Sequence, residues 1–432
     1  MGGMNAMKAD TIEAQLHAMG DAARVAFTVL AAAPAEQKTK ALTAMAKAIR
    51  ASSAQILTAN AKDYAAAQTK GLTSAMLDRL QLNDKRIASM AAGIEQIATL
   101  PDPIGKVIES WDNAENGLHF EKVAVPLGVI GIIYESRPNV TADAVAMCIK
   151  SGNACILRGG SESANSAHAI MDAIHHGLRE AGLPHDVAQL VATTDREAVG
   201  VMLRMRGYLD VMIPRGGESL TRRVAEESLV PTILHLTGNC HIYIHDAADT
   251  AKAVRIVHNA KLRRTGICGA LESLLIDRKV LKTIGAAVIK DLLDADCEVR
   301  GDAEIQKLDG RVKEATADDW GTEYLEKIVS AKVVDSTAEA IAHINRYGSH
   351  HTDAILTEDA NVAEQFTRSI DSAIVLVNAS TQFADGGEFG FGGEIGIATG
   401  RLHARGPVGA AQLATYKYIV TTKDAAGAIR AG

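Results

Sequence analysis

Residues 122–135 read KVAVPLGVIGIIYE, and this stretch decides the fold class. Its run of aliphatic and β-branched residues, interrupted only by turn residues, predicts a buried strand. A helical segment, TADAVAMCIKSG at 141–152, comes next, and ACILRGG at 154–160 predicts a second buried strand that ends in a glycine pair. Strands that alternate with helices of ten or more residues predict a parallel, doubly wound sheet.

The same alternation runs through most of the chain. Further strands are predicted in VAQLVATT (187–194) and LDVMIPRGG (209–217), and a new series begins near residue 246. Residues 10–100 predict amphipathic helices, because their apolar residues recur at three- and four-residue spacing. The tail QLATYKYIVTTKD (412–424) alternates like an exposed strand. We therefore expect two α/β domains with a ligand-binding cleft between them.

Composition narrows the class of protein. The 432 residues are 47% apolar and 22% charged, which is ordinary for a globular protein. The net charge of −7 argues against a general nucleic-acid binder. Five cysteines without C-x-x-C spacing fit a reducing cytosol and argue against a disulfide framework or a zinc site. The N-terminus has no signal-peptide pattern and no apolar run reaches about 18 residues, so we expect a cytoplasmic protein without a membrane span.

One cysteine stands apart from the other four. Cys268 lies in KLRRTGICGALES (261–273), after three basic residues and beside two glycines. The charges of Lys261, Arg263 and Arg264 would favour its thiolate. A helix that begins near Gly269 would do the same through its dipole. The local sequence fits a second interpretation equally well, in which Cys268 is a buried cysteine in a glycine turn.

Two predicted strands end in Arg-Gly-Gly. In ILRGGSES (156–163) and IPRGGESL (213–220) a helix follows, so backbone N–H groups at these turns can bind phosphate. A bare glycine pair also serves as a tight strand–helix turn. Two such turns in one sheet favour a nucleotide site more than either does alone.

The stretch STQFADGGEFGFGGEIGIATGRLHARGP (380–407) mixes glycines with aromatic residues. It is too polar for a core and too aromatic for a linker, which is typical of an ordered loop that carries function. Arg401, His403 and Arg405 are candidates to hold a carboxylate or a phosphate. The same three residues also fit a solvated basic turn.

A series of motifs, in one order from about residue 122 to residue 420, resembles the γ-glutamyl phosphate reductases, a branch of the aldehyde dehydrogenase superfamily. Those that carry the resemblance include VPLGVIGIIYESRPNVTADA, DVMIPRGGESL, HLTGNCHIYI, NAKLRRTGICGALESLL and NASTQFADGGEFGFGGEIGI. The resemblance implies an α/β fold of the aldehyde dehydrogenase type. This fold has two doubly wound parallel-sheet domains and a small β-ribbon for oligomerisation.

The resemblance also implies domain boundaries. We expect a cofactor-binding domain over residues 1–245, with an inserted ribbon strand at about 111–125. A catalytic domain that carries Cys268 would cover 246–380. A return segment and a C-terminal oligomerisation strand would cover 381–432, and the expected assembly is a homo-oligomer, either a dimer or a tetramer.

Roles for individual residues follow from the same resemblance. Cys268 matches the family nucleophile, and NADPH is the expected hydride donor. Ser161 stands where NAD-using relatives have a Glu that binds the ribose hydroxyls. The short Ser leaves room for a 2′-phosphate, and Arg158 can offset its charge. The other matches are Gly159, Gly160, Gly216, Gly217 and Glu323 for the cofactor, Asn139 for the oxyanion, and Arg137, Asp385 and Arg405 for the substrate.

His235 marks a departure from hydrolytic aldehyde dehydrogenases. Those enzymes carry a Glu in an L-E-L-G-G motif, and this Glu activates water against a thioester. Here the stretch reads Leu-His-Leu-Thr-Gly, with His235 placed 33 residues before Cys268. The loss would protect a thioester from hydrolysis, and whether His235 is catalytic or structural stays open. Gly269, Gln382 and Ala398 also depart from the family pattern, and Gln382 puts one substrate-carboxylate contact in doubt.

The implied reaction is the NADPH-dependent reduction of L-glutamyl 5-phosphate to L-glutamate 5-semialdehyde and phosphate through a Cys268 thioester, the second step of proline biosynthesis from glutamate. A separate glutamate 5-kinase is the expected transient partner. Two rival interpretations remain. His235 speaks against a hydrolytic aldehyde dehydrogenase, and Cys268 together with both glycine turns speaks against a non-catalytic nucleotide-binding or redox-sensing protein.

Overall fold

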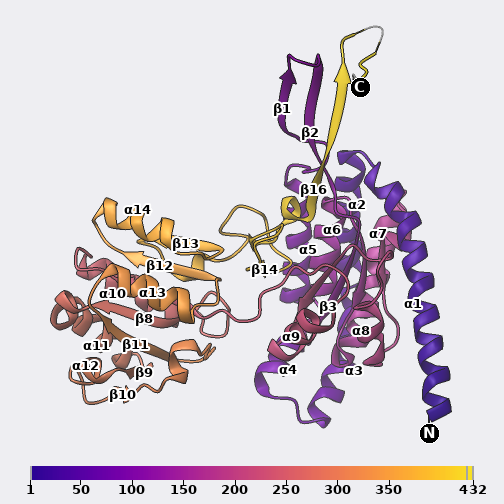
Figure 1. Cartoon of the computed structure of the whole chain (residues 1–432). Coiled ribbons are helices and arrows are strands. Elements are labelled where there is room, and N and C mark those ends of the chain that lie inside the picture. Colours follow the sequence, from indigo (N-terminus) through magenta and orange to yellow (C-terminus); the bar gives the residue numbers. More distant parts are fainter. Residues whose placement is uncertain (1, 425–426, 431–432) are drawn as a thin grey trace. The chain divides into compact units, whose positions relative to one another are not determined.

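The computed structural model describes residues 2–424 and 427–430, with side chains from residue 11 onward except at position 75. The chain forms two compact units (Figure 1). Unit 1 comprises residues 1–234, 390–396 and 408–432, and unit 2 comprises 235–389 and 397–407. The sequence placed the first boundary after residue 245 and a single return point at 381. The structure instead has the chain pass between the units four times.

A four-stranded parallel sheet forms the centre of unit 1, with strand order β5-β4-β3-β6. The chain winds from β3 outward through β4 to β5 and then returns to the other side of β3, so the prediction of a doubly wound parallel sheet is confirmed. The carboxyl ends of all four strands lie at one edge, where ligands of such sheets bind. The strands are β3 (Val129–Tyr134), β4 (Ala154–Arg158), β5 (Ala188–Leu190) and β6 (Val211–Arg215).

Helices cover this sheet, and the amphipathic N-terminal region is helical as predicted. α2 and α7 cross closely because Gly177 has no side chain: a Cβ there would lie 2.4 Å from the backbone nitrogen of Met45. The helices of unit 1 are α1 (Gly2–Ala31), α2 (Ala35–Ala51), α3 (Ser53–Thr69), α4 (Ser74–Leu80), α5 (Asp84–Thr99), α6 (Val140–Lys150), α7 (Ala164–Glu180), α8 (Glu197–Met202) and α9 (Glu218–Glu227).

A three-stranded antiparallel ribbon extends from unit 1 (Figure 1). Its order is β1-β2-β16, with bounds β1 (Val107–Asn113), β2 (Leu118–Pro126) and β16 (Ala414–Thr422). The exposed C-terminal strand is therefore confirmed. The single ribbon strand predicted at about 111–125 is wrong, because a turn at 114–117 divides the segment into the β1–β2 hairpin.

Unit 2 contains a seven-stranded parallel sheet of order β10-β9-β11-β8-β7-β12-β13. Its strands are β7 (Cys240–Ile244), β8 (Leu271–Asp277), β9 (Glu298–Gly301), β10 (Lys313–Glu314), β11 (Ile328–Val334), β12 (Thr352–Leu356) and β13 (Ile374–Val377). Its helices are α10 (Thr250–Leu262), α11 (Ala286–Asp294), α12 (Ala303–Gln306), α13 (Thr337–Tyr347) and α14 (Ala360–Ser369). β14 (Ile397–Ala398) and β15 (Gly406–Pro407) form a separate short pair.

Among the described residues, no helix combines the length and the apolar character that a membrane crossing requires.

Candidate active site

Cys268 lies in the turn that joins α10 to β8 in unit 2. The side chain of Asp249 starts α10 by accepting a hydrogen bond from the backbone N–H of Lys252, at 2.8 Å. The helix ends at Leu262, and the turn then runs directly into the buried strand β8. The predicted helix start near Gly269 is wrong, so no helix dipole activates the Cys268 thiol from that side.

The backbone of Cys268 is held by Gly238, which lies just before β7, and by Cys240, the first residue of β7. Gly238 packs so closely that a Cβ there would lie 2.2 Å from the Cys268 carbonyl oxygen. The thiol of Cys240 donates a hydrogen bond to the same oxygen, at 3.1 Å. Gly269 is also restricted, because its Cβ would lie 3.0 Å from the Thr381 carbonyl oxygen. This close packing fixes where the Cys268 side chain begins.

Two imidazoles gather at the Cys268 sulfur. The Sγ of Cys268 and one ring nitrogen each of His235 and His351 lie within 4.8 Å of one another. Nδ1 of His235 donates to the Ile397 carbonyl at 2.8 Å, which leaves the Nε2 lone pair of the neutral ring to act as an acceptor. Burial lowers the pKa of His351 to about 3, so this ring is neutral at physiological pH.

Among the basic residues that precede Cys268, Lys261 does not act as the sequence predicted. Lys261 is fully buried and forms an ion pair with Glu272, with 2.6 Å between Nζ and Oε2. Arg263 donates to the Gln382 side chain at 3.2 Å. Because a counter-ion neutralises Lys261, its charge cannot favour a thiolate as an isolated cation would. The imidazoles of His235 and His351 are the groups that the structure brings to the Cys268 sulfur instead.

The five cysteines all lie within the described residues, and Cys268 is the one whose side chain is not buried. Burial raises the pKa of Cys297 to about 11 and raises the pKa of Cys240 well above its ordinary value. Both thiols therefore stay protonated and inert. The interpretation of Cys268 as a buried turn cysteine is excluded by its partial exposure.

Gln382 holds the end of α10. Its Nε2 donates to the carbonyl oxygens of Ala260 and Arg264, at 2.8 and 3.0 Å, while its Oε1 accepts from Arg263. The side chain is 5% exposed. Gln382, at which this chain departs from the family pattern, therefore holds the segment before Cys268 in place.

The predicted cofactor residues of β4 lie together at one strand end in unit 1. Arg158 ends β4, Gly159 and Gly160 form the turn, and Ser161 begins a short helical turn with its side chain exposed. Arg158 is 7% exposed, and its guanidinium donates to the carbonyl oxygens of Gly159 and Thr194, at 2.9 and 2.8 Å. Arg158 thus braces this turn from inside.

The second glycine turn follows β6 at the same edge of the sheet. The N–H of Gly217 donates to the Glu135 carboxylate at 2.9 Å. A Cβ at Gly216 would lie 2.4 Å from that carboxylate, so a side chain there would require Glu135 to move. The sequence does not mark Glu135. Its carboxylate accepts a hydrogen bond from the Gly217 N–H, a group that was expected to bind a phosphate.

Arg137 and Asn139 lie between β3 and α6, both partly exposed. The amide of Asn139 donates to the Asp143 carboxylate at 2.9 Å. Burial raises the pKa of Asp143 to about 6. These two predicted residues belong to unit 1, whereas Cys268 belongs to unit 2.

The predicted substrate residues of unit 2 make local contacts. Asp385 is exposed and accepts from the N–H groups of Gly387 and Glu388, at 2.8 and 3.3 Å. Arg405 forms an ion pair with Asp371 at 2.8 Å and also donates to the Asp371 carbonyl oxygen. Glu323 is partly exposed, just before β11. Their predicted substrate and cofactor roles stay predictions.

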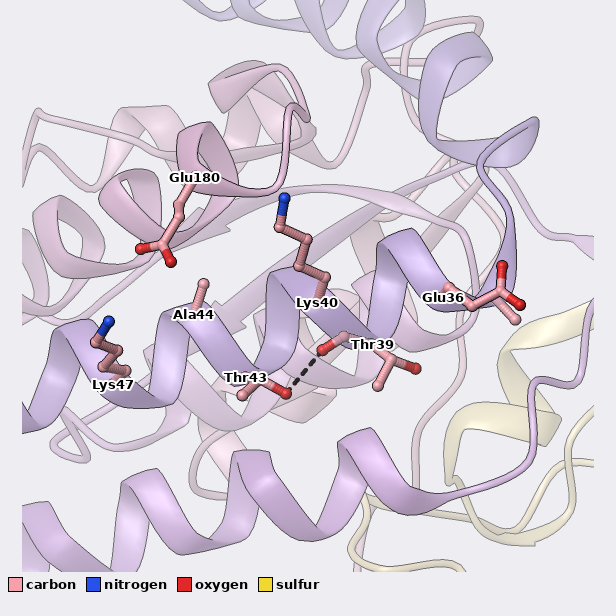
Figure 2. Close-up of a pocket in the computed structure, with 8 residues that line it drawn as sticks. Glu36, Thr39, Lys40, Thr43, Ala44, Lys47 and Glu180 are labelled. Atoms are coloured by element: carbon pink, nitrogen blue, oxygen red, sulfur yellow. Dashed lines mark hydrogen bonds between the residues drawn. The ribbon is translucent and has the colours of Figure 1, made fainter.

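Two surface hollows lie elsewhere and include none of the predicted site residues. One, of about 600 Å³, runs along α2, with Lys40, Lys47 and Glu180 at its walls (Figure 2). The other, of about 880 Å³, lies beside α10 and the segment that ends in Phe383.

Comparison with known proteins agrees with this arrangement. The sequence model of the Aldehyde dehydrogenase family matches residues 5–302. The chain is 56% identical to a gamma-glutamyl phosphate reductase of Paramagnetospirillum magneticum over 96% of this chain and 98% of that one. It is 58% identical to one of Rhodopseudomonas palustris, over 93% and 94%.

A solved structure extends the agreement to the fold. The crystal structure of gamma-glutamyl phosphate reductase from Thermotoga maritima matches with a TM-score of 0.92 and 44% identity, over 94% of this chain and 98% of that one. The aldehyde-dehydrogenase-like fold is therefore confirmed. The chain belongs to the γ-glutamyl phosphate reductases of the aldehyde dehydrogenase family, oxidoreductases of proline biosynthesis that act on an acyl phosphate or aldehyde.

Proposed function

We propose that this enzyme reduces L-glutamyl 5-phosphate to L-glutamate 5-semialdehyde and phosphate, with NADPH as reductant and a thioester on Cys268. The observation that carries the proposal is the partly exposed Cys268 thiol, held by a fixed backbone beside His235. Covalent catalysis of this kind divides one difficult transfer into two easier steps. The first step forms the thioester and the second reduces it.

In the first step His235 accepts the thiol proton. Its Nδ1–H is held by the Ile397 carbonyl, so its Nε2 is the nitrogen that can take the proton. The Cys268 thiolate then attacks the acyl carbon, a C–S bond forms, and the C–O bond to phosphate breaks with both electrons leaving on phosphate. The predicted donors to the oxyanion are the Cys268 backbone N–H and the Asn139 amide. Such donors typically contribute about 10²–10³ in rate.

In the second step NADPH, when bound, supplies a hydride to the thioester carbonyl. The C–S bond then breaks, the aldehyde leaves, and the sulfur departs as a thiolate. The departing phosphate takes up one proton, which bulk water supplies, and the hydride step consumes none, so His235 can keep the thiol proton through both steps. An imidazolium cannot activate water, so the thioester is protected from hydrolysis until it has been reduced.

The β4 turn has features that fit a 2′-phosphorylated nicotinamide cofactor. The Nε of Arg158 is buried without a hydrogen-bond partner among the described residues, and the adjacent Ser161 is exposed at the start of a helical turn. A Cβ at Gly160 would lie 2.2 Å from the Glu162 carboxylate, so a side chain there would displace that carboxylate. Ser161 would contact the phosphate and Arg158 would contribute charge from below. Glu323 is proposed to hold the nicotinamide ribose.

The ribbon supports the proposal of a homo-oligomer. Trp111, Phe120 and Val420 pair across its three strands and so lie on one face. Tyr416 and Tyr418 share that face, since residues two apart in a strand point the same way. Exposed aromatic faces of this kind mark interaction sites. Transient contact with a glutamate 5-kinase stays a prediction.

Replacement of single cysteines tests the function. Cys268→Ala should lose turnover and keep near-normal NADPH binding, because it removes only the nucleophile. Cys297→Ala is the matched control in the same unit and should retain turnover, since its thiol is buried and protonated. Steady-state rates and NADPH titration by fluorescence give the two readouts. Substantial activity in Cys268→Ala would refute the thioester mechanism.

A further inference from the structure

The cluster of Cys268, His235 and His351 carries one more inference, because its three side chains form a ligand set. Their sulfur and ring nitrogens lie within 4.8 Å of one another, and all three residues belong to unit 2. One thiolate with two imidazoles is a donor set that Zn²⁺ prefers, whereas Mg²⁺ and Ca²⁺ prefer oxygen ligands. Sequence spacing could not reveal this set, because the three residues are spread over positions 235–351.

Each imidazole is already oriented by a second contact. Nδ1 of His235 donates to the Ile397 carbonyl at 2.8 Å, and Nδ1 of His351 lies 2.9 Å from the Thr352 hydroxyl. Metal-binding histidines usually have such a partner on the other ring nitrogen, because it fixes the tautomer and the ring orientation. In both residues the contact at Nδ1 therefore assigns Nε2 as the nitrogen that would bind a cation.

His351 supplies an independent indication of a ligand. Its side chain is fully buried, and its Nε2 has no hydrogen-bond partner among the described residues. A buried polar atom without a partner costs free energy and calls for an explanation. A cation bound between this nitrogen and the Cys268 sulfur would satisfy it.

The distances suit zinc after a small adjustment. In tetrahedral geometry, bonds of about 2.0 Å to nitrogen and 2.3 Å to sulfur separate the ligand atoms by roughly 3.3–3.6 Å. The distance between any two of the three ligand atoms would therefore shorten by about 1.5 Å at most. Cys268 and His235 are partly exposed, which provides a route of entry. Three protein ligands leave the fourth position to water, as in open zinc sites.

We propose that His235, Cys268 and His351 form a reversible Zn²⁺ site that inhibits the enzyme by occupying its nucleophile. Binding exchanges the thiol proton of Cys268 for a Zn–S bond, and a chelator reverses the exchange without any change in oxidation state. The inhibitory part rests on the proposed function, because it requires Cys268 to be the nucleophile. The proposal that these three residues bind Zn²⁺ does not depend on that function.

Binding is measured on the full-length enzyme with Co²⁺ as a spectroscopic probe and Zn²⁺ as its competitor. The wild type should bind one Co²⁺ per chain and show a sulfur-to-cobalt charge-transfer band that Zn²⁺ removes. Cys268→Ser should lose this band. His351→Gln should weaken Zn²⁺ binding by at least about tenfold, since even the loss of an outer-shell partner typically costs 10–100-fold.

His343→Gln is the matched control. His343 is a second buried histidine of unit 2 whose Nε2 lacks a partner among the described residues, but it lies outside the cluster. This variant should bind Zn²⁺ as the wild type does. Should His351→Gln fail to fold, as judged by circular dichroism, Cys268→Ser still decides, because serine is nearly isosteric at this partly exposed position.

The outcomes separate the two proposals. Zn²⁺ affinity that is equal in the wild type, Cys268→Ser and His351→Gln would overturn the site, and so would a cobalt spectrum without the sulfur band. If binding follows these variants but the Zn²⁺-loaded enzyme keeps full turnover, the inhibitory proposal fails together with the nucleophile assignment, while the metal site stands. In the expected result, His351→Gln raises the Zn²⁺ concentration for half-inhibition by the same factor as its dissociation constant.

Discussion

Gly238 restrains the position of Cys268, the proposed nucleophile, although it has no part in the proposed chemistry. A methyl group there would collide with the Cys268 carbonyl, 2.2 Å from its ideal position, so the Cys268 turn would have to move. A displacement of about 1 Å at a reacting group can cost about 100-fold in rate. Gly238→Ala should therefore lower kcat by about that factor and leave NADPH binding unchanged.

The control for this substitution is Gly321→Ala in the same unit. No atom lies within 4 Å of a Cβ at Gly321, so its steady-state rate should match the wild type. Equal rates in the Gly238 and Gly321 variants would show that the close packing at Gly238 does not position Cys268.

Ser161 determines the cofactor preference in the proposed function. A Glu at this exposed position would repel a 2′-phosphate and could accept hydrogen bonds from both ribose hydroxyls. Ser161→Glu should shift the ratio of kcat/KM values from NADPH towards NADH. An unchanged ratio would contradict the assignment of this turn to the adenosine ribose.

The sequence predicted some residues of the site and not others for a physical reason. Cys268 and Ser161 lie within motifs that resemble those of the γ-glutamyl phosphate reductases, and this resemblance predicts their roles. His351 and Glu135 contact the site only through the folded chain, so no local pattern marks them. The prediction for Lys261 is wrong for the same reason, because Glu272 on β8 neutralises its charge and no local pattern marks that pairing.

At the scale of elements, α13 carries a histidine that makes unit 2 sensitive to acid. Burial lowers the pKa of His343 from its ordinary 6.5 to about 3. Between these values the unfolded chain binds a proton that the folded protein does not. Stability therefore falls as the pH drops through 6.5, by about 2 kcal/mol between pH 7 and pH 5 for this one group.

His343→Gln removes this titrating group. Between pH 7 and pH 5 the free energy of unfolding of the variant should therefore fall by about 2 kcal/mol less than that of the wild type. Urea unfolding at both pH values, followed by circular dichroism, measures the difference. His176→Gln replaces an exposed histidine on α7 and should behave like the wild type. Identical losses in all three proteins would contradict a buried neutral His343.

The sequence periodicity predicted the long helices and strands but not the short ones. The alternation of apolar strands and amphipathic helices is local, and it predicted β3, α6 and β4, although residues 122–135 form the end of β2 and then β3 rather than one strand. β10 has two residues and β9 has four, and each exists only because a neighbouring strand pairs with it. The segment after Cys268 became a strand rather than a helix because β8 is buried between β7 and β11.

At the scale of the whole molecule, the ribbon is the element that predicts assembly. Tyr418 and Val420 are 54% and 47% exposed on its aromatic face. Replacing both with Lys should convert the proposed homo-oligomer into a smaller species, because charge on this face opposes association. Size-exclusion chromatography with light scattering reports the mass. A wild-type protein that is monomeric at assay concentrations would contradict the proposed role of the ribbon.

The reaction run in reverse tests the central claim most directly. The enzyme receives L-glutamate 5-semialdehyde and NADP⁺, with or without inorganic phosphate, and NADPH formation is followed by absorbance. Without phosphate the account predicts at most one NADPH per Cys268, because the thioester forms and is not hydrolysed. With phosphate it predicts steady turnover to the acyl phosphate. Steady NADPH formation without phosphate, with free glutamate accumulating, would contradict the account and identify a hydrolytic enzyme.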